Sequence, residues 1–140
     1  EERAALARFL ALIGVRNTKG AGDLGPEEAR AGVESLAGAL VEMGWVLWAA
    51  SPPDYFIGSS SPFHAAFPQG DASQTAGFGI TAPQVEITFA LGPRVALHAT
   101  WSRKGALWRP ARERVVLEVN GRTCAGAKQF LFSPQPAVPG

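Results

Sequence analysis

Three consecutive serines, Ser59 to Ser61, carry the most evident chemical potential in the chain. A serine nucleophile needs a histidine base, for which His64 is close in sequence, and an acid such as Asp54 to orient that base. The sharp turn that exposes such a serine has the pattern Gly-x-Ser-x-Gly, because glycine lets the turn close. Pro62 stands at the second glycine position. We therefore expect the hydroxyls to bond local backbone groups, and we predict no catalytic residue.

A literal Gly-x-Gly-x-x-Gly motif runs from Gly20 to Gly25 and precedes a predicted helix. A dinucleotide site would also need a strand before the motif and a helix end free to receive the pyrophosphate. The preceding apolar residues have helical spacing instead, and Asp23, Glu27 and Glu28 would place negative charge where the phosphates should lie. The motif therefore predicts a connection between two helices, and we predict no cofactor.

Metal ligands are equally scarce. The chain has two histidines, one cysteine and scattered carboxylates without paired spacing, so we predict no metal site. Cys124 cannot form a disulfide within the chain, which favours a small buried side chain and a reducing, cytoplasmic compartment. The longest apolar run, Trp45 to Ala50, is too short to span a bilayer, and we predict no membrane partner.

Charge is unevenly distributed along the chain. Residues 1 to 93 carry five basic and ten acidic side chains, and residues 94 to 140 carry eight basic and two acidic ones. This split fits either an internal match between the two parts or a basic face for an anionic partner, and we favour the internal match. Trp101 and Trp108 are interleaved with a basic run, as in proteins that bind single-stranded nucleic acid. We nevertheless expect a solvated connection and regard nucleic acid as an improbable partner. The basic run comprises Arg103, Lys104, Arg109, Arg112 and Arg114.

Hydrophobic periodicity predicts three helices. Residues 2 to 14 have an apolar face at helical spacing. A second helix over residues 26 to 43 begins at Pro26, where a missing N–H is tolerated, and Gly44 is expected to stop it. A third helix is predicted over residues 111 to 131. The expected buried side chains are Leu6, Phe9, Leu10 and Ile13 in the first helix and Val115, Val116, Val119, Thr123, Ala127, Phe130 and Leu131 in the third.

Alternating apolar and polar residues from 85 to 101 predict a β-hairpin with one buried face and a turn at Gly92-Pro93. Short apolar runs at 45 to 49 and 55 to 57 predict two further strands, for which a hairpin is the expected arrangement. Glycine, serine and proline are too frequent between residues 58 and 84 for a regular element, so this interval is predicted to be a long loop.

This order of elements predicts an α+β fold with a mostly antiparallel sheet of about four strands packed against two or three helices. We expect one domain over residues 1 to 133, followed by a loose proline-rich tail over residues 134 to 140. The helices over residues 26 to 43 and 112 to 131 are predicted to share one face of a sheet formed by residues 45 to 57 and 85 to 101.

The predicted binding residues are polar side chains on these elements. Asn120 lies on the apolar face of the third helix, where an unbonded amide is costly, so we expect it to be buried and to bond the serine loop or a neighbouring backbone. His98 lies on the same strand face as Arg94 and is expected to be a structural histidine. The complete predicted binding set is Ser59, Ser60, Ser61, Arg94, His98 and Asn120.

Three separated segments together carry a family resemblance: FIGSSSPF at residues 56–63, EITFALGPRVAL at residues 86–97 and VNGRTCAGAKQFLFS at residues 119–133. In their order and spacing they resemble the bacterial family called domain of unknown function 4238. The first segment is similar to that family's F-I-T-S-D-N-P and the second to its E-I-x-F-P-L-S-P-R-x-A-L. The third is similar to its helix with an early Asn and a late aromatic pair.

The chain also departs from that family. Ser60 and Ser61 stand where the family has an acidic residue and Asn, so the resemblance does not carry acid chemistry to this loop. The family's amino-terminal segment, similar to His-Tyr-x-Pro, is absent from the chain. We therefore expect this domain to be part of a longer protein and to carry only the carboxy-terminal half of any shared site.

The sequence favours a non-catalytic binding or interaction module whose partner is another protein or another part of the same chain. The alternative is a fragment of an enzyme, acting on nucleic acid, whose catalytic part lies outside these residues. The two hypotheses differ in the kind of site that they require. A deep polar pocket containing His98 favours the enzyme, whereas a flat apolar patch favours the interaction module.

Overall fold

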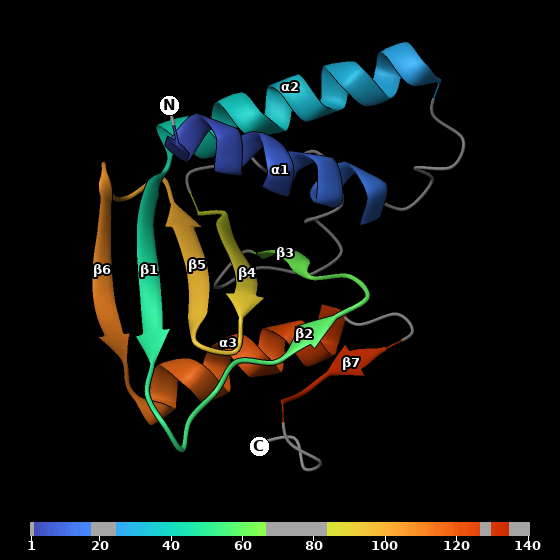
Figure 1. Cartoon of the computed structure of the whole chain (residues 1–140). Coiled ribbons are helices and arrows are strands. Elements are labelled where there is room, and N and C mark those ends of the chain that lie inside the picture. Colours follow the sequence, from blue (N-terminus) through green and yellow to red (C-terminus); the bar gives the residue numbers. More distant parts are fainter. Residues whose placement is uncertain (1, 18–24, 67–83, 127–129, 135–140) are drawn as a thin grey trace.

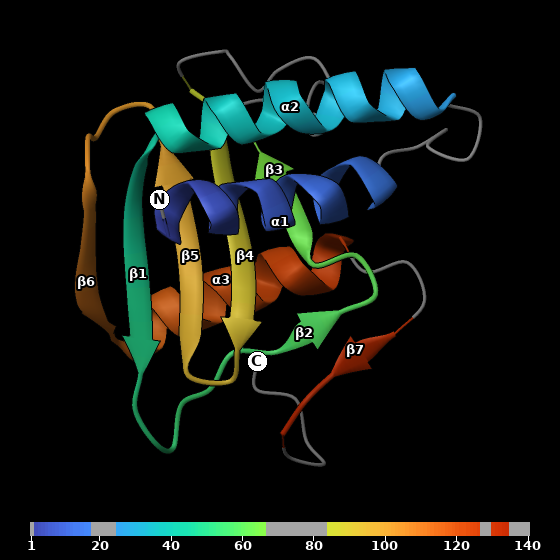
Figure 2. The ribbon, with the colours of Figure 1, turned by 45° about the horizontal axis from the view of Figure 1, so that its top comes forward.

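The computed structural model describes residues 2–17, 25–66, 84–126 and 130–134. These residues form three layers, in which two helices cover one face of a five-stranded sheet and a third helix covers the other (Figures 1 and 2). The α+β class and the mostly antiparallel sheet are as predicted. In chain order the elements are α1 (Glu2–Asn17), α2 (Pro26–Glu42), β1 (Gly44–Ala50), β2 (Gly58–Ser59), β3 (Phe63–Ala66), β4 (Glu86–Gly92), β5 (Val95–Thr100), β6 (Ala106–Ala111), α3 (Glu113–Gly126) and β7 (Leu131–Phe132).

Helices α1 and α2 pack side by side on the sheet. Leu10 of α1 and Leu40 of α2 are fully buried against Ile87 and Leu97 of the sheet, and each such side chain contributes about 1.5–3 kcal/mol by leaving water. Helix α1 is longer than the predicted 2 to 14. Its buried face is also rotated from the predicted one, because Phe9 is 52% exposed while Ala7 and Ala11 are fully buried and Gly14 lies against Leu36 of α2 and Phe63 of β3.

The main sheet has the strand order β3-β4-β5-β1-β6. Strands β4 and β5 form the predicted hairpin, in which Phe89 pairs with Leu97. Strand β1 pairs antiparallel with β5 and parallel with β6. The predicted hairpin between residues 45 to 49 and 55 to 57 is therefore wrong: residues 55–57 form no strand, and β1 is a central strand whose partners come from much later in the chain.

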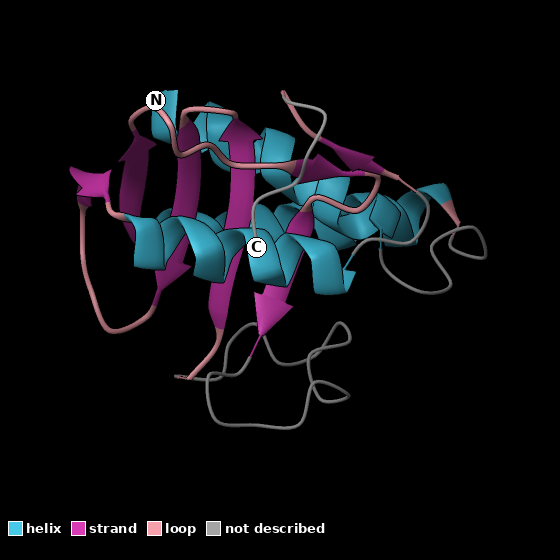
Figure 3. Ribbon diagram, turned by 90° about the horizontal axis from the view of Figure 1, so that it is seen from below, coloured by secondary structure: helices cyan, strands magenta, loops and turns pink. Residues whose placement is uncertain are grey.

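Helix α3 lies on the face of the sheet opposite to α1 and α2 (Figure 3). The prediction that the second and third helices share one face is therefore wrong. Val116 and Val119 of α3 pack with Ala96 of β5 and with Phe56, whereas Leu97 faces α1 and α2. Both faces of the β4–β5 hairpin are therefore covered, and Ala96 is buried on the face opposite to that of Leu97.

The ends of α3 also differ from the predicted helix over residues 111 to 131. Residues 106–111 form the edge strand β6 rather than a connection, and β7 replaces the last helical turn. Phe130 and Leu131, predicted to be buried, are 61% and 42% exposed. Cys124, predicted to be buried, is exposed on α3.

Two short strands interrupt the predicted loop between residues 58 and 84. Strand β3 pairs with β4 at one edge of the main sheet, and β2 pairs with β7 in a separate two-stranded ribbon. The remaining loop residues, 67–83, lie outside the described part of the chain, as do most of the glycine motif at residues 20–25 and the tail after residue 134.

Gly44 begins β1 instead of capping α2. The helix ends at Glu42, and the extended backbone of its C-cap residue, Met43, leads directly into the strand. A Cβ atom on Gly44 would collide with the backbone carbonyl of Arg103, so glycine is needed here for a close approach of two chain segments. Among the described residues, no helix is both long and apolar enough to cross a membrane.

Candidate functional site

Asn120 clamps the irregular segment from Asp54 to Ile57 against α3. Its side chain is 2% exposed, its Oδ1 accepts a hydrogen bond from the Ile57 N–H at 3.0 Å, and its Nδ2 donates to the Tyr55 carbonyl at 3.0 Å. One amide thus supplies the donor and the acceptor that a neighbouring strand would otherwise supply. The prediction of a buried, bonded Asn120 is confirmed, and its partner is the backbone just before the serines.

The tip of the β4–β5 hairpin holds the same segment from the other side. The Phe56 N–H donates to the Pro93 carbonyl at 2.8 Å, and the Arg94 guanidinium donates to the Asp54 carbonyl at 2.9 Å. Phe56 is 1% exposed, so its ring anchors the segment while the backbone bonds fix its path. Residues 54–57 are therefore rigidly placed even though they belong to no strand.

The three serines join this segment to the end of the chain. Ser59 is buried, and its hydroxyl accepts from the Ser61 N–H at 3.0 Å, as predicted for a turn that satisfies its own backbone. The Ser60 N–H donates to the Phe130 carbonyl at 3.0 Å, and the Phe130 N–H donates to the Ser60 hydroxyl at 3.2 Å. These bonds fix the β2–β7 ribbon and with it the exposed rings of Phe130 and Phe132.

An open hollow of about 360 Å³ lies between this ribbon and the hairpin tip. Its walls are mostly apolar. Leu91 and Phe132, which line it, are 36% and 58% exposed, and the ring of Phe130, 61% exposed, lies 6.4 Å from that of Phe132 in a tilted arrangement. Exposed apolar side chains gathered at one place are typical of binding surfaces. The lining residues are Phe56, Gly58, Ala90, Leu91, Gly92, Pro93, Phe132, Ser133 and Pro134.

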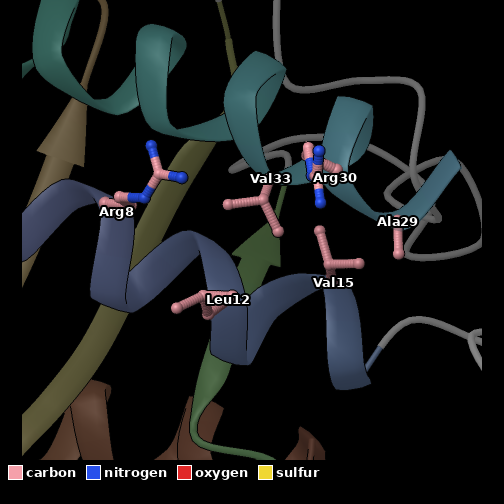
Figure 4. Close-up of a pocket in the computed structure, with 6 residues that line it drawn as sticks. All are labelled: Arg8, Leu12, Val15, Ala29, Arg30 and Val33. Carbon is pink, nitrogen blue, oxygen red and sulfur yellow. The ribbon is translucent and has the colours of Figure 1, made fainter. Parts of the chain in front are cut away.

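A second hollow, of about 260 Å³, opens between α1 and α2 (Figure 4). Leu12, Val15 and Val33 form its apolar wall, and Arg8 and Arg30 lie at its sides. The guanidinium of Arg8 is paired with Glu34 at 2.6 Å. No residue of the predicted binding set lines this hollow or the one beside the β4–β5 turn.

His98 lies apart from the serines, in an ionic network between the sheet and α3. Its Nε2 is 2.8 Å from one carboxylate oxygen of Glu86, and the other oxygen of Glu86 is 3.4 Å from the guanidinium of Arg122. Arg122 also contacts Glu118 at 3.0 Å, one turn away on the helix. The His98 and Glu86 side chains are 23% and 19% exposed. A histidine oriented by a carboxylate is suited to accept a proton, but the same arrangement also neutralises buried charge between two layers.

His64 lies in the same row of strand positions, because it pairs with Thr88, which in turn pairs with His98. Burial lowers the pKa of His64 below its ordinary value of 6.5, and the positive charge of Arg122 lowers it further. Its Nδ1 is buried and finds no hydrogen-bond partner within the described ranges. His64 is therefore held neutral at pH 7.

The structure brings together five of the six predicted binding residues. Arg94, Asn120 and the three serines all bond the segment between residues 54 and 61 or the chain end paired with it, whereas His98 bonds Glu86. None of the five lines the hollow itself, but Arg94 and Asn120 hold residues 54–57, of which Phe56 lines it. The sequence reasoning missed the exposed side of its wall, because alternation placed Leu91 on the buried face of the hairpin and Phe132 lies just beyond the predicted third helix.

Within the described residues, no group of three or more His, Cys, Asp or Glu side chains is arranged to hold a metal ion. Comparisons with protein-family models, with curated proteins and with solved structures found no match. The function must therefore be argued from the geometry of this chain alone.

Proposed function

We propose that this chain is a non-catalytic interaction module, and that its binding site is the hollow between the β2–β7 ribbon and the β4–β5 turn. The observation that carries the proposal is the exposure of Leu91 and Phe132, which line this hollow, with the exposed ring of Phe130 lying 6.4 Å from that of Phe132. Its volume of about 360 Å³ suits one or two apolar side chains of a protein partner rather than a large ligand. A polar rim is supplied by Ser133 and by backbone groups of the turn.

The rigidity of the wall supports this role. Asn120, Arg94 and Pro93 fix residues 54–57 before any partner arrives, so binding does not have to order that segment. Preorganisation of this kind raises affinity because less conformational entropy is lost on association. The family resemblance, the bacterial origin that it implies and a cytoplasmic location with a single unpaired Cys124 remain parts of this proposal.

Peptide selection tests the proposed site. A display library of random twelve-residue peptides is selected on the protein, and the enriched peptides are titrated against Phe132→Ser, which removes an exposed ring from the rim. We expect at least a tenfold rise in Kd, because a central apolar contact is worth about 1.4 kcal/mol or more. Phe9→Ser on α1, a similarly exposed ring far along the chain, is the matched control and leaves Kd unchanged. Peptides that bind Phe132→Ser as tightly as the wild type contradict the proposal.

An enzymatic role is the alternative, and the observation that favours it is the 2.8 Å contact between His98 and Glu86. Neither of the two hollows is lined by His98, so the deep polar pocket that this alternative requires is not among them. His98→Gln separates the two proposals. The interaction module retains its peptide affinity in this variant, whereas a site built on the His98–Glu86 pair loses it.

A further inference from the structure

A second binding surface, independent of the hollow, lies on the edge strand β6. Every residue from Ser102 to Pro110 is exposed, including Leu107 at 37% and Trp108 at 62%. Strand β6 is the outermost strand on its side, beyond the part of the sheet that α1 and α2 cover (Figures 1 and 2). Side chains on both of its faces are therefore accessible.

The outer backbone edge of β6 is open as well. In a parallel ladder, alternate residues of one strand bond the neighbour and the others turn their N–H and C=O groups away. The Trp45 N–H donates to the Gly105 carbonyl at 2.8 Å, and Trp45 pairs with Ala106. The odd-numbered residues of this segment, such as Leu107, therefore bond β1. Ala106, Trp108 and Pro110 then point their backbone groups outward. Proline fits this assignment, because it is tolerated in a strand only where no ladder N–H is needed.

The charge around this edge is strongly positive. Residues 103 to 114 contain five basic side chains and one acidic side chain, all exposed. None of the five basic side chains forms a salt bridge within the described part of the chain, where Glu86 and Glu118 pair with His98 and Arg122 instead. The internal charge match that the sequence favoured is thus not found for the basic run.

We propose that β6 binds an extended, acidic segment of another protein, which adds as a further strand. The open edge supplies main-chain hydrogen bonds, Leu107 and Trp108 supply apolar contacts on opposite faces, and Arg109 with its basic neighbours selects acidic side chains. A second copy of this chain does not fit, since pairing β6 with β6 would bring two strongly basic edges together. Single-stranded nucleic acid fits less well, because it needs a series of aromatic platforms and β6 offers one strongly exposed ring.

The test uses the protein as it stands and an eight-residue peptide of alternating Glu and Val, blocked at both ends. We expect binding at low salt that weakens as salt rises, because the contacts involve exposed charges. Arg109→Gln combined with Arg112→Gln raises Kd at least tenfold, whereas Arg30→Gln, an exposed arginine on α2, leaves Kd unchanged. The same peptide with N-methyl groups on consecutive residues cannot form a strand ladder and does not bind.

Amide exchange locates the contact at single-residue resolution. In the free protein the Trp108 amide exchanges fast and the Leu107 amide slowly, and the peptide protects the Trp108 amide. A peptide in which Lys replaces every Glu overturns the proposal if it binds as tightly as the acidic peptide. Binding of the N-methylated acidic peptide also overturns it. Tighter binding of an oligothymidylate that competes with the peptide, or no binding of the acidic peptide at all, also overturns it. Phe132→Ser leaves this binding intact, so the outcome is separate from that at the hollow.

Discussion

Replacing Asn120 with Ala is the substitution whose cost follows most directly from the structure. The variant removes the acceptor of the buried Ile57 N–H and the donor to the Tyr55 carbonyl. A buried polar group that loses its partner costs about 1–3 kcal/mol. Two such losses, lowered by water that enters the space of the missing amide, give an expected loss of about 3 kcal/mol in the free energy of unfolding.

Urea unfolding monitored by tryptophan fluorescence measures this loss, and an unchanged m-value shows that the two end states are comparable. Thr123→Val is the matched control. Thr123 is also buried on α3, but its hydroxyl donates only to the Val119 carbonyl of the same helix, so its removal is expected to cost less than about 1 kcal/mol. A cost for Asn120→Ala below about 1 kcal/mol, or equal to that of the control, would refute the clamp. Faster amide exchange at Ile57 in the variant is the local sign of the lost bond.

Two further predictions concern glycine and histidine. Gly44→Ala is expected to lower the free energy of unfolding by about 1–3 kcal/mol, because the new methyl group meets the Arg103 backbone. Gly38→Ala is expected to raise that free energy by about 0.5–1 kcal/mol, because a Cβ atom at this position on α2 meets no other atom. If urea unfolding finds Gly44→Ala more stable than Gly38→Ala, β1 and the loop before β6 can separate. Because the pKa of His64 is lowered in the folded protein, the unfolded chain binds more protons, and stability is expected to fall as the pH drops below about 6.5 towards the folded pKa. His64→Gln is expected to flatten this part of the stability curve, and an unchanged slope would show that other groups produce it.

Patterns local in sequence predicted their elements well. Apolar spacing and Pro26 located α2, and strict alternation with Gly92-Pro93 located the β4–β5 hairpin. Asn120 was also predictable, since an amide among apolar residues on a helix must find a partner. These features depend on neighbours within a few turns or strand positions, where sequence spacing reports three-dimensional proximity.

Features that depend on distant partners were not predictable in the same way. Strand β1 pairs with β5 and β6 and not with the apolar run that follows it, and nothing in its own residues indicates which strands it pairs with. Strand β6 is exposed on both faces and contains Pro110, so it lacks the alternation of a half-buried strand. Phe130 and Leu131 were assigned to the core because their spacing continues that of α3, yet Leu131 lies in β7 and both side chains are exposed.

The central claim is that the hollow beside the β4–β5 turn receives apolar side chains, and a titration with N-acetyl-phenylalaninamide followed by amide NMR tests it most directly. The claim predicts saturable, concentration-dependent shifts that are largest for the amides of Gly58 and Gly92, which line the hollow, and that are lost in Phe132→Ser. Shifts confined to the α1–α2 hollow around Val15 and Val33, or equal shifts in the wild type and the variant, would contradict it.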